Sequence, residues 1–168
     1  MSGCGQSLES LLPTLSTAPN VDIQRYMGTW YEIAKYPVTF ENGCFGVTAD
    51  YTLQSDGNVK VVNICRNEDG TVGRTIEGFA TVADSTTNSK LTVYFFYPFG
   101  APYWIIELDE ADYEWAVVGD PTRTFLWILS RTPTLAPEIY DGILQRLPDR
   151  GYDPVRLELM PQFPEETP

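Results

Sequence analysis

Eight short runs rich in Tyr, Val, Ile and Thr follow one another through the middle of the chain, and turn-forming residues separate each run from the next. Runs of this length and composition predict β-strands, and the short connections predict a meander of antiparallel neighbours. An eight-stranded meander can close on itself, which removes the exposed edges of the sheet. We therefore expect an all-β fold, an eight-stranded antiparallel up-and-down β-barrel. The expected strands are residues 29–36, 47–54, 58–65, 74–82, 90–96, 103–108, 113–119 and 124–130.

A single C-terminal α-helix is expected after these strands. Thr134 is a candidate cap, Pro137 suits the first turn, and Gly151 suits the end of the helix. Because an eight-stranded barrel has room inside only for side chains or one small ligand, the apolar face of this helix must pack on the outside. A short ninth strand is expected at residues 155–160. The apolar face of the helix consists of Ile139, Ile143, Leu144 and Leu147.

The chain of 168 residues has the length of one domain. Residues 1–20 contain many Ser, Thr and Pro residues and are expected to form a flexible N-terminal tether. Residues 21–162 then form the barrel domain, and residues 163–168 form a tail. No run of about 18 apolar residues occurs, so no membrane-spanning segment is expected.

Charge and histidine content exclude several classes of function. Eleven Lys and Arg face 23 Asp and Glu, and the formal net charge of −12 disfavours nucleic-acid binding. The chain contains no histidine. This excludes Ser-His and Cys-His nucleophilic pairs and every zinc site that needs a histidine. We expect no metal and no cofactor.

The chain has three cysteines, Cys4, Cys44 and Cys65. Cys44 and Cys65 flank a predicted hairpin whose turn is centred on Asp56, so the hairpin would bring them close enough for a disulfide. The alternative is two buried free thiols in a cytosolic protein. Cys4 follows Ser2 and Gly3, and Ser-Gly-Cys matches the end of a bacterial lipobox, whose cysteine is acylated. The hydrophobic run that normally precedes a lipobox is missing, so a chance match is the alternative.

Three segments together resemble the lipocalin family. They are Gly-Thr-Trp-Tyr-Glu at 28–32, Val-Gly-Asp-Pro at 118–121 and Leu-Trp-Ile-Leu-Ser-Arg-Thr-Pro at 126–133. The resemblance runs from residue 21 to residue 162 and implies the lipocalin (calycin) barrel. Residues 45–51 and 124–131 look most like bacterial lipocalins of the outer-membrane lipoprotein type and apolipoprotein D. The cysteine positions depart from the apolipoprotein D pattern, so the disulfides of that protein are not carried over.

The resemblance implies a location and a closed barrel end. Because the bacterial relatives are lipoproteins, it implies acylation of Cys4 and attachment to the periplasmic side of an outer membrane, with a periplasmic or secreted form as the alternative. In the family, the residues that match Trp30 and Arg131 stack at the closed end of the barrel, which gives both a structural role. A cation–π contact of this kind contributes about 0.5–2 kcal/mol.

Strand alternation predicts which side chains face the interior. Placing Glu77 and Glu107 outward turns their neighbours inward, and the first and last strands follow Trp30 and Trp127 as inward residues. Both faces of residues 90–96 are apolar, and Tyr94 and Phe96 are taken as the inward pair. Aromatic residues of the loops at the other end are expected to surround an open mouth. The alternative is that these rings cap a filled core. The expected ligand-binding residues are Ala34, Tyr36, Phe40, Gly78, Ala80, Tyr94, Phe96, Tyr103, Trp104, Ile106, Phe125 and Trp127.

Three arginines, Arg66, Arg74 and Arg123, are expected beside the mouth of this acidic protein. They are candidates for binding the carboxylate or phosphate head group of a lipid. The alternative is that they are solvated charges that compensate nearby acidic residues.

Three hypotheses of function follow. The first is a non-catalytic protein that binds and transports or stores small amphipathic lipids, of the fatty acid or lysophospholipid class, at a membrane surface. The second is a lipid-modifying enzyme of lipocalin fold that uses a pocket cysteine or Glu32, the one inward carboxylate that alternation suggests. The third is a protein-interaction barrel with a filled core. Pairing of two chains into a homodimer through the open mouth is left open.

Overall fold

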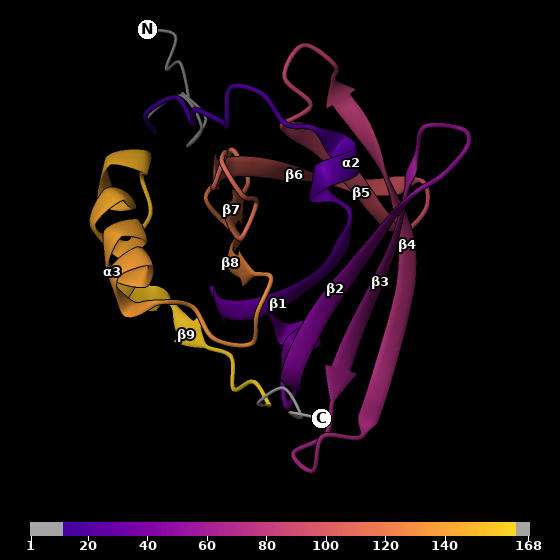
Figure 1. Ribbon diagram of the computed structural model, residues 1–168, viewed down its shortest axis with the longest axis vertical. Coiled ribbons are helices and arrows are strands. Elements are labelled where there is room, and N and C mark those ends of the chain that lie inside the picture. Colours follow the sequence, from indigo (N-terminus) through magenta and orange to yellow (C-terminus); the bar gives the residue numbers. More distant parts are fainter. Residues whose placement is uncertain (1–11, 164–168) are drawn as a thin grey trace, which may run out of the picture.

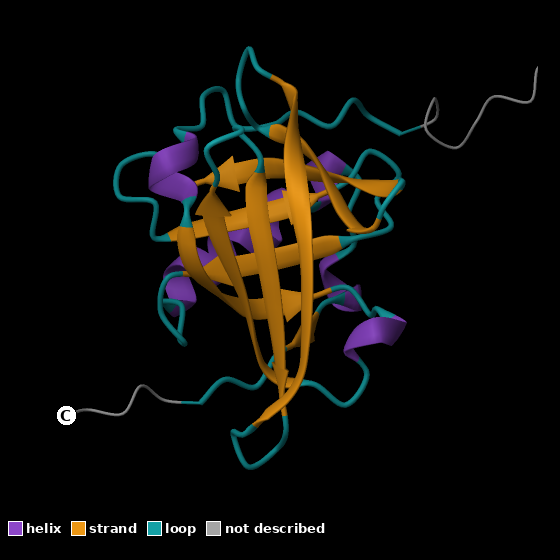
Figure 2. Ribbon diagram, turned by 90° about the vertical axis from the view of Figure 1, so that its right-hand side faces the viewer, coloured by secondary structure: helices purple, strands orange, loops and turns teal. Residues whose placement is uncertain are grey.

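The computed structural model describes residues 12–163 and shows a closed antiparallel β-barrel (Figures 1 and 2). Each barrel strand pairs with the next, and β1 pairs with both β8 and β2, which closes the sheet. β9 pairs with the last residues of β1. The expected eight-stranded barrel with a ninth strand is confirmed. The strands are β1 (Gly28–Lys35), β2 (Phe45–Leu53), β3 (Val59–Arg66), β4 (Val72–Asp84), β5 (Lys90–Phe96), β6 (Phe99–Leu108), β7 (Trp115–Gly119), β8 (Leu126–Ser130) and β9 (Glu158–Leu159).

The main helix, α3 (Pro137–Arg146), packs on the outside of the barrel, as expected (Figure 1). It begins after Ala136 without a side-chain cap, so Thr134 is not the cap that the sequence suggested. Helix α2 (Ile23–Tyr26) precedes β1. Three short 3-10 turns complete the helical elements. They are η1 (Thr39–Glu41), η2 (Pro148–Arg150) and η3 (Pro154–Arg156), and η3 occupies the beginning of the expected ninth strand.

The sheet separates two apolar cores. The inner core lies within the barrel and includes Trp30, Tyr51 and Ile105. The outer core lies between the barrel and α3, and there Ile128 of β8 packs with Ile143 and Leu147. The face of α3 that the sequence marked as apolar therefore covers the outward side of β8.

The described part of the N-terminal segment lies against the barrel. Leu15 and Ala18 are buried, and the Ala18 amide donates a hydrogen bond to the Ile105 carbonyl at 2.9 Å. Residues 12–20 are therefore an ordered strap, which corrects the expectation of a flexible tether over this part. Cys4, the candidate lipidation site, lies outside the described residues. Within residues 12–163, no helix is long and apolar enough to cross a membrane.

Candidate ligand-binding cavity

A cavity of about 740 Å³ occupies the interior of the barrel. This volume lies in the range of sites for small organic ligands. Its wall is formed mainly by apolar side chains from β2 to β6 and from β8. The barrel is therefore not filled by its own side chains.

The closed end of the cavity is built around Trp30, which is fully buried. Its indole Nε1 donates a hydrogen bond to the Tyr26 carbonyl at 2.9 Å. The Arg131 guanidinium lies over the indole ring, with its carbon 3.8 Å from the ring centre. Arg131 also donates hydrogen bonds to the carbonyls of Thr29, Tyr113 and Arg25. This stacked pair joins α2, β1 and the loop before β7 into one floor.

Three tyrosines form a polar cluster near this floor, and sequence patterns did not reveal it. The Tyr103 hydroxyl lies 2.8 Å from that of Tyr26 and 2.9 Å from that of Tyr51. Burial raises the pKa of Tyr51 to about 12, while the hydrogen bond with Tyr103 opposes the shift. The three hydroxyls therefore stay protonated at neutral pH and form a polar site in a mainly apolar wall.

The mouth lies at the opposite end and carries exposed aromatic rings. Phe40 is 58% exposed, Phe96 72% and Phe99 80%, and all three also line the cavity. They come from η1 and from the β5–β6 connection. Large apolar side chains at an opening give an apolar chain a continuous path from the surface to the interior.

Half of the sequence-predicted ligand-binding residues lie in the cavity wall. They are Phe40, Ala80, Phe96, Tyr103, Phe125 and Trp127. The other six are not part of the cavity wall. Bulges explain the difference for four of them, and the packing of β5 explains it for Tyr94 and Gly78.

Ala34 and Tyr36 belong to the outer core, not to the cavity wall. The pairing of β1 with β8 is interrupted by a bulge between Glu32 and Ala34. A bulge adds one residue to one strand and so reverses the alternation beyond it. The inward orientation expected from Trp30 therefore holds at Glu32 and is wrong at Ala34 and Tyr36.

A second bulge changes which side chains of β6 face the interior. It lies between Ile105 and Glu107 in the pairing with β7. Glu107 faces outward, where Arg146 Nε lies 2.5 Å from Oε1, but the alternation is reversed before the bulge. As a result, Trp104 and Ile106 lie in the outer core, and Ile105 lies in the inner core.

The expected positions of Tyr94 and Gly78 in the cavity wall are wrong because of the way β5 packs. The Tyr94 ring stacks on Phe79 at 4.9 Å, while its neighbours Val93 and Phe95 line the cavity. Both faces of β5 are apolar, so the pattern alone could not choose between them. A side chain added at Gly78 would meet the Tyr94 carbonyl at 2.2 Å and the Phe95 ring at 2.8 Å. The Phe95 ring and the Tyr94 carbonyl therefore occupy the space beside Gly78, so Gly78 is not part of the cavity wall.

Only one of the three candidate arginines lines the cavity. Arg74 does so, and its Nη2 donates to the Asn42 carbonyl at 3.2 Å. Arg66 points toward β2 and donates to the Gly46 carbonyl at 2.5 Å. Arg123 is buried and donates to the carbonyls of Pro13, Pro121 and Arg150, so its expected head-group role is wrong. Its guanidinium fastens the N-terminal strap to the outside of the barrel.

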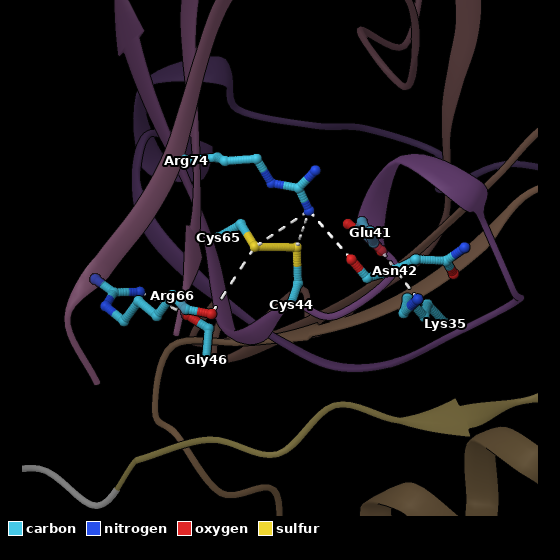
Figure 3. Close-up of a disulfide and its surroundings, with 8 residues drawn as sticks. All are labelled: Lys35, Glu41, Asn42, Cys44, Gly46, Cys65, Arg66 and Arg74. Atoms are coloured by element: carbon cyan, nitrogen blue, oxygen red, sulfur yellow. Dashed lines mark hydrogen bonds and ion pairs between the residues drawn. A yellow bond between two sulfur atoms is a disulfide. The ribbon is translucent and has the colours of Figure 1, made fainter. Parts of the chain in front are cut away.

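The disulfide between Cys44 and Cys65 is present, with Cα atoms 5.2 Å apart, and it joins the start of β2 to the end of β3 (Figure 3). Both cysteines line the cavity near its mouth, and Arg74 Nη2 lies 3.2 Å from the Cys44 sulfur. The disulfide closes a loop with a sequence separation of 21 residues. No group of three or more Cys, Asp or Glu side chains that could hold a metal occurs within residues 12–163.

Loss of this disulfide is expected to lower the free energy of unfolding by about 3 kcal/mol, because the cross-link restricts the unfolded chain. Urea unfolding of a Cys44→Ser/Cys65→Ser variant measures the change. A Cys4→Ser variant controls for the loss of a cysteine as such. A loss below about 1 kcal/mol would show that the disulfide does not stabilise the barrel in this way.

Two carboxyl groups lie in the cavity wall on the side of β1 and η1. Glu32 and Glu41 are only 4% and 8% exposed, and both line the cavity. Burial raises the pKa of Glu32 well above its usual range, and the neighbouring Glu41 raises it further, while Lys35 opposes both effects. Alternation indicated Glu32 as an inward carboxylate, but Glu41 lies in a 3-10 turn of the mouth loop and was missed.

Comparison with known proteins assigns the chain to a family. The model of the lipocalin-like domain matches residues 21–162. The chain is 36% identical to outer membrane lipoprotein Blc of Vibrio cholerae over 157 residues, covering 94% of this chain and 90% of that protein. It is 42% identical to Blc of Escherichia coli K12 over 80% of this chain and 75% of that protein. It is 42% identical to apolipoprotein D of Bos taurus over 71% of this chain and 65% of that protein.

A solved structure agrees with the fold. Insecticyanin from the tobacco hornworm Manduca sexta superimposes with a TM-score of 0.72 at 22% identity, covering 92% of this chain and 87% of that one. With a closed barrel, a stacked Trp and Arg pair at its floor and a family match over almost its whole length, the chain belongs to the lipocalin-like domain family.

Proposed function

We propose that the protein binds small amphipathic lipids, of the fatty acid or lysophospholipid class, and transports or stores them in its barrel. The observation that carries this proposal is the apolar cavity of about 740 Å³, which is closed at the Trp30 floor and opens between exposed phenylalanines. An apolar tail would lie inside, and its polar head would remain near the mouth.

The energetics favour such a ligand. Burying one methylene contributes about 0.8 kcal/mol, so a long acyl tail can offset the cost of ordering and still bind at micromolar level or better. Discrimination between tails would be weak because one methylene more or less changes the affinity little. Arg74 is the arginine in a position to pair with a carboxylate or phosphate near the disulfide.

The relatives support a location for this activity. Two of them are named outer membrane lipoproteins. We propose that this protein works at the outer membrane or in the periplasm, anchored by acylation of Cys4. Native mass spectrometry of the protein from its own membrane fraction would report the acyl group, the bound lipid and the number of chains together.

Purified protein is expected to carry lipid and to bind a fluorescent fatty-acid probe that other lipids displace. Trp127 lines the cavity, whereas Trp30 lies in the floor and Trp104 packs in the outer core. Probe binding should therefore quench the fluorescence of Trp127, and a Trp127→Phe variant should lose most of that quenching. Repeatedly empty extracts without any displacement of the probe would refute lipid binding.

A hydrolytic or isomerising enzyme receives less support. The disulfide leaves neither Cys44 nor Cys65 as a thiolate nucleophile. Glu32 remains as a buried carboxyl, and a carboxyl of this kind more often serves to bind than to react. Lipid turnover that disappears in a Glu32→Gln variant would favour the enzyme over the carrier.

A further inference from the structure

Each of the two carboxyl groups in the cavity wall has one oxygen atom without a hydrogen-bond partner. Glu32 Oε1 and Glu41 Oε2 are fully buried, and neither accepts a hydrogen bond from any described residue. A buried acceptor that is left unpaired is unfavourable, so a donor that reaches it stabilises the bound state. Glu32 and Glu41 both line the cavity, so a molecule inside it can reach this pair.

The positive charge near the pair is smaller than the negative charge. Lys35 Nζ lies 3.4 Å from Glu41 Oε2, close enough for an ion pair although the geometry is not that of a hydrogen bond. Lys35 also lies 4.0 Å from Glu158, which is exposed. Among residues 12–163, no other Lys or Arg comes within 4.0 Å of Glu32 or Glu41. If both carboxyls were ionised, Lys35 would balance one of them and the other would keep an uncompensated charge, which is consistent with the raised pKa of Glu32.

The bulge in β1 creates this arrangement. Glu32 pairs with Leu129 and Lys35 pairs with Trp127, and both partners line the cavity. The two-residue step of regular alternation therefore becomes a three-residue step, which places Glu32 and Lys35 on one face. η1 brings Glu41 to the same place from the mouth loop (Figure 3). Glu32 also contributes to the raised pKa of the floor tyrosine Tyr51.

We propose that Glu32 and Glu41 form an acceptor subsite in the cavity wall that binds a primary ammonium group carried by an otherwise apolar ligand. This inference rests on the proposed lipid binding and adds a head-group chemistry to it. One ammonium brings three donors and one positive charge. It would supply the missing partners of Glu32 Oε1 and Glu41 Oε2 and balance the remaining carboxylate. A carboxylate head group would be repelled from this position.

The test compares three probes with the same tail and different heads: tetradecylamine, tetradecan-1-ol and tetradecanoate. In a competition titration, each of these three compounds displaces the fluorescent fatty-acid probe from the full-length protein. The titration is carried out at neutral pH and about 0.15 M salt, where exposed charges are largely screened. We expect the amine to bind at least about tenfold more tightly than the alcohol, because a charge-assisted hydrogen bond is about twice as strong as a neutral one.

Three variants assign the preference to the subsite. Glu32→Gln and Glu41→Gln should each reduce the preference for the amine over the alcohol to about twofold or less, while alcohol binding remains. Glu77→Gln removes an equal charge from the exposed outside of β4 and should keep the full preference. Circular dichroism confirms that each variant folds. Because Glu41 pairs with Lys35, the Glu32→Gln variant serves alone if Glu41→Gln fails to fold.

The outcomes are distinct. Equal binding of amine and alcohol to the unmodified protein overturns the acceptor subsite and leaves lipid binding intact. An amine preference that persists in Glu32→Gln also overturns it, since the attraction would then come from the acidic surface. If none of the three probes binds, the proposed lipid binding itself fails.

Discussion

Replacing Trp30 with alanine is expected to lower the free energy of unfolding by about 3–5 kcal/mol, which is the usual cost of truncating a fully buried aromatic side chain. The indole is completely buried, donates a hydrogen bond to the Tyr26 carbonyl and lies under the Arg131 guanidinium. Removing the indole would leave a void in the floor, and the Arg131 guanidinium would lose the ring on which it stacks. Urea unfolding followed by circular dichroism measures the loss.

Trp104→Ala is the matched control for this prediction. Trp104 lies on the outside of β6, where it is only partly buried and Lys90 Nζ lies 4.4 Å from its ring centre. We expect less than half the loss of Trp30→Ala, because less apolar surface is buried at this position. Similar losses for the two variants would mean that the floor is no more important to stability than the outer surface.

Filling the lower cavity is expected to weaken binding of a long-chain lipid about hundredfold or more. Ala49 and Ala80 line the cavity, and Ala49 pairs with Trp30 of the floor. Tryptophan at both positions would occupy space that the end of the tail otherwise fills. Displacing four methylenes forfeits about 3 kcal/mol at about 0.8 kcal/mol each, which corresponds to a factor of more than about one hundred.

The length of the lipid tail provides a stricter test of this prediction. The loss in the Ala49→Trp/Ala80→Trp variant should be large for sixteen-carbon tails and small for tails short enough to avoid the added rings. Thr81→Trp, at the outward position beside Ala80, should bind all lengths like the unmodified protein. Displacement titrations with a series of fatty acids measure the effect, and a loss independent of tail length would place the lipid outside the barrel.

Local patterns were enough to predict the strands and the helix. Turn signals divide the chain into runs that match the eight barrel strands closely, because strand and turn propensities act over a few residues. The disulfide could also be predicted from the sequence, since the Asp56 turn brings Cys44 and Cys65 together within a single hairpin. The apolar face of α3, which packs on the outside of the barrel, followed from its helical repeat.

Strand faces were predictable only as far as the first irregularity. Alternation is a property of one strand, whereas a bulge is defined by the pairing of two strands. Glu32 therefore followed Trp30 correctly, but Tyr36 did not. In β6, Glu107 was correctly placed outward, whereas Trp104 was wrongly placed inward.

The sequence by itself determined the meander, its closure into a barrel and the tryptophan and arginine of its floor, because short-range propensities and motifs encode them. Only the tertiary structure decided which side chains meet in the cavity. Glu41 reaches Glu32 from a loop, and Arg123 turns away to bind carbonyls of distant segments. Contacts between residues far apart in the chain depend on bulges and loop paths, and no local pattern records them.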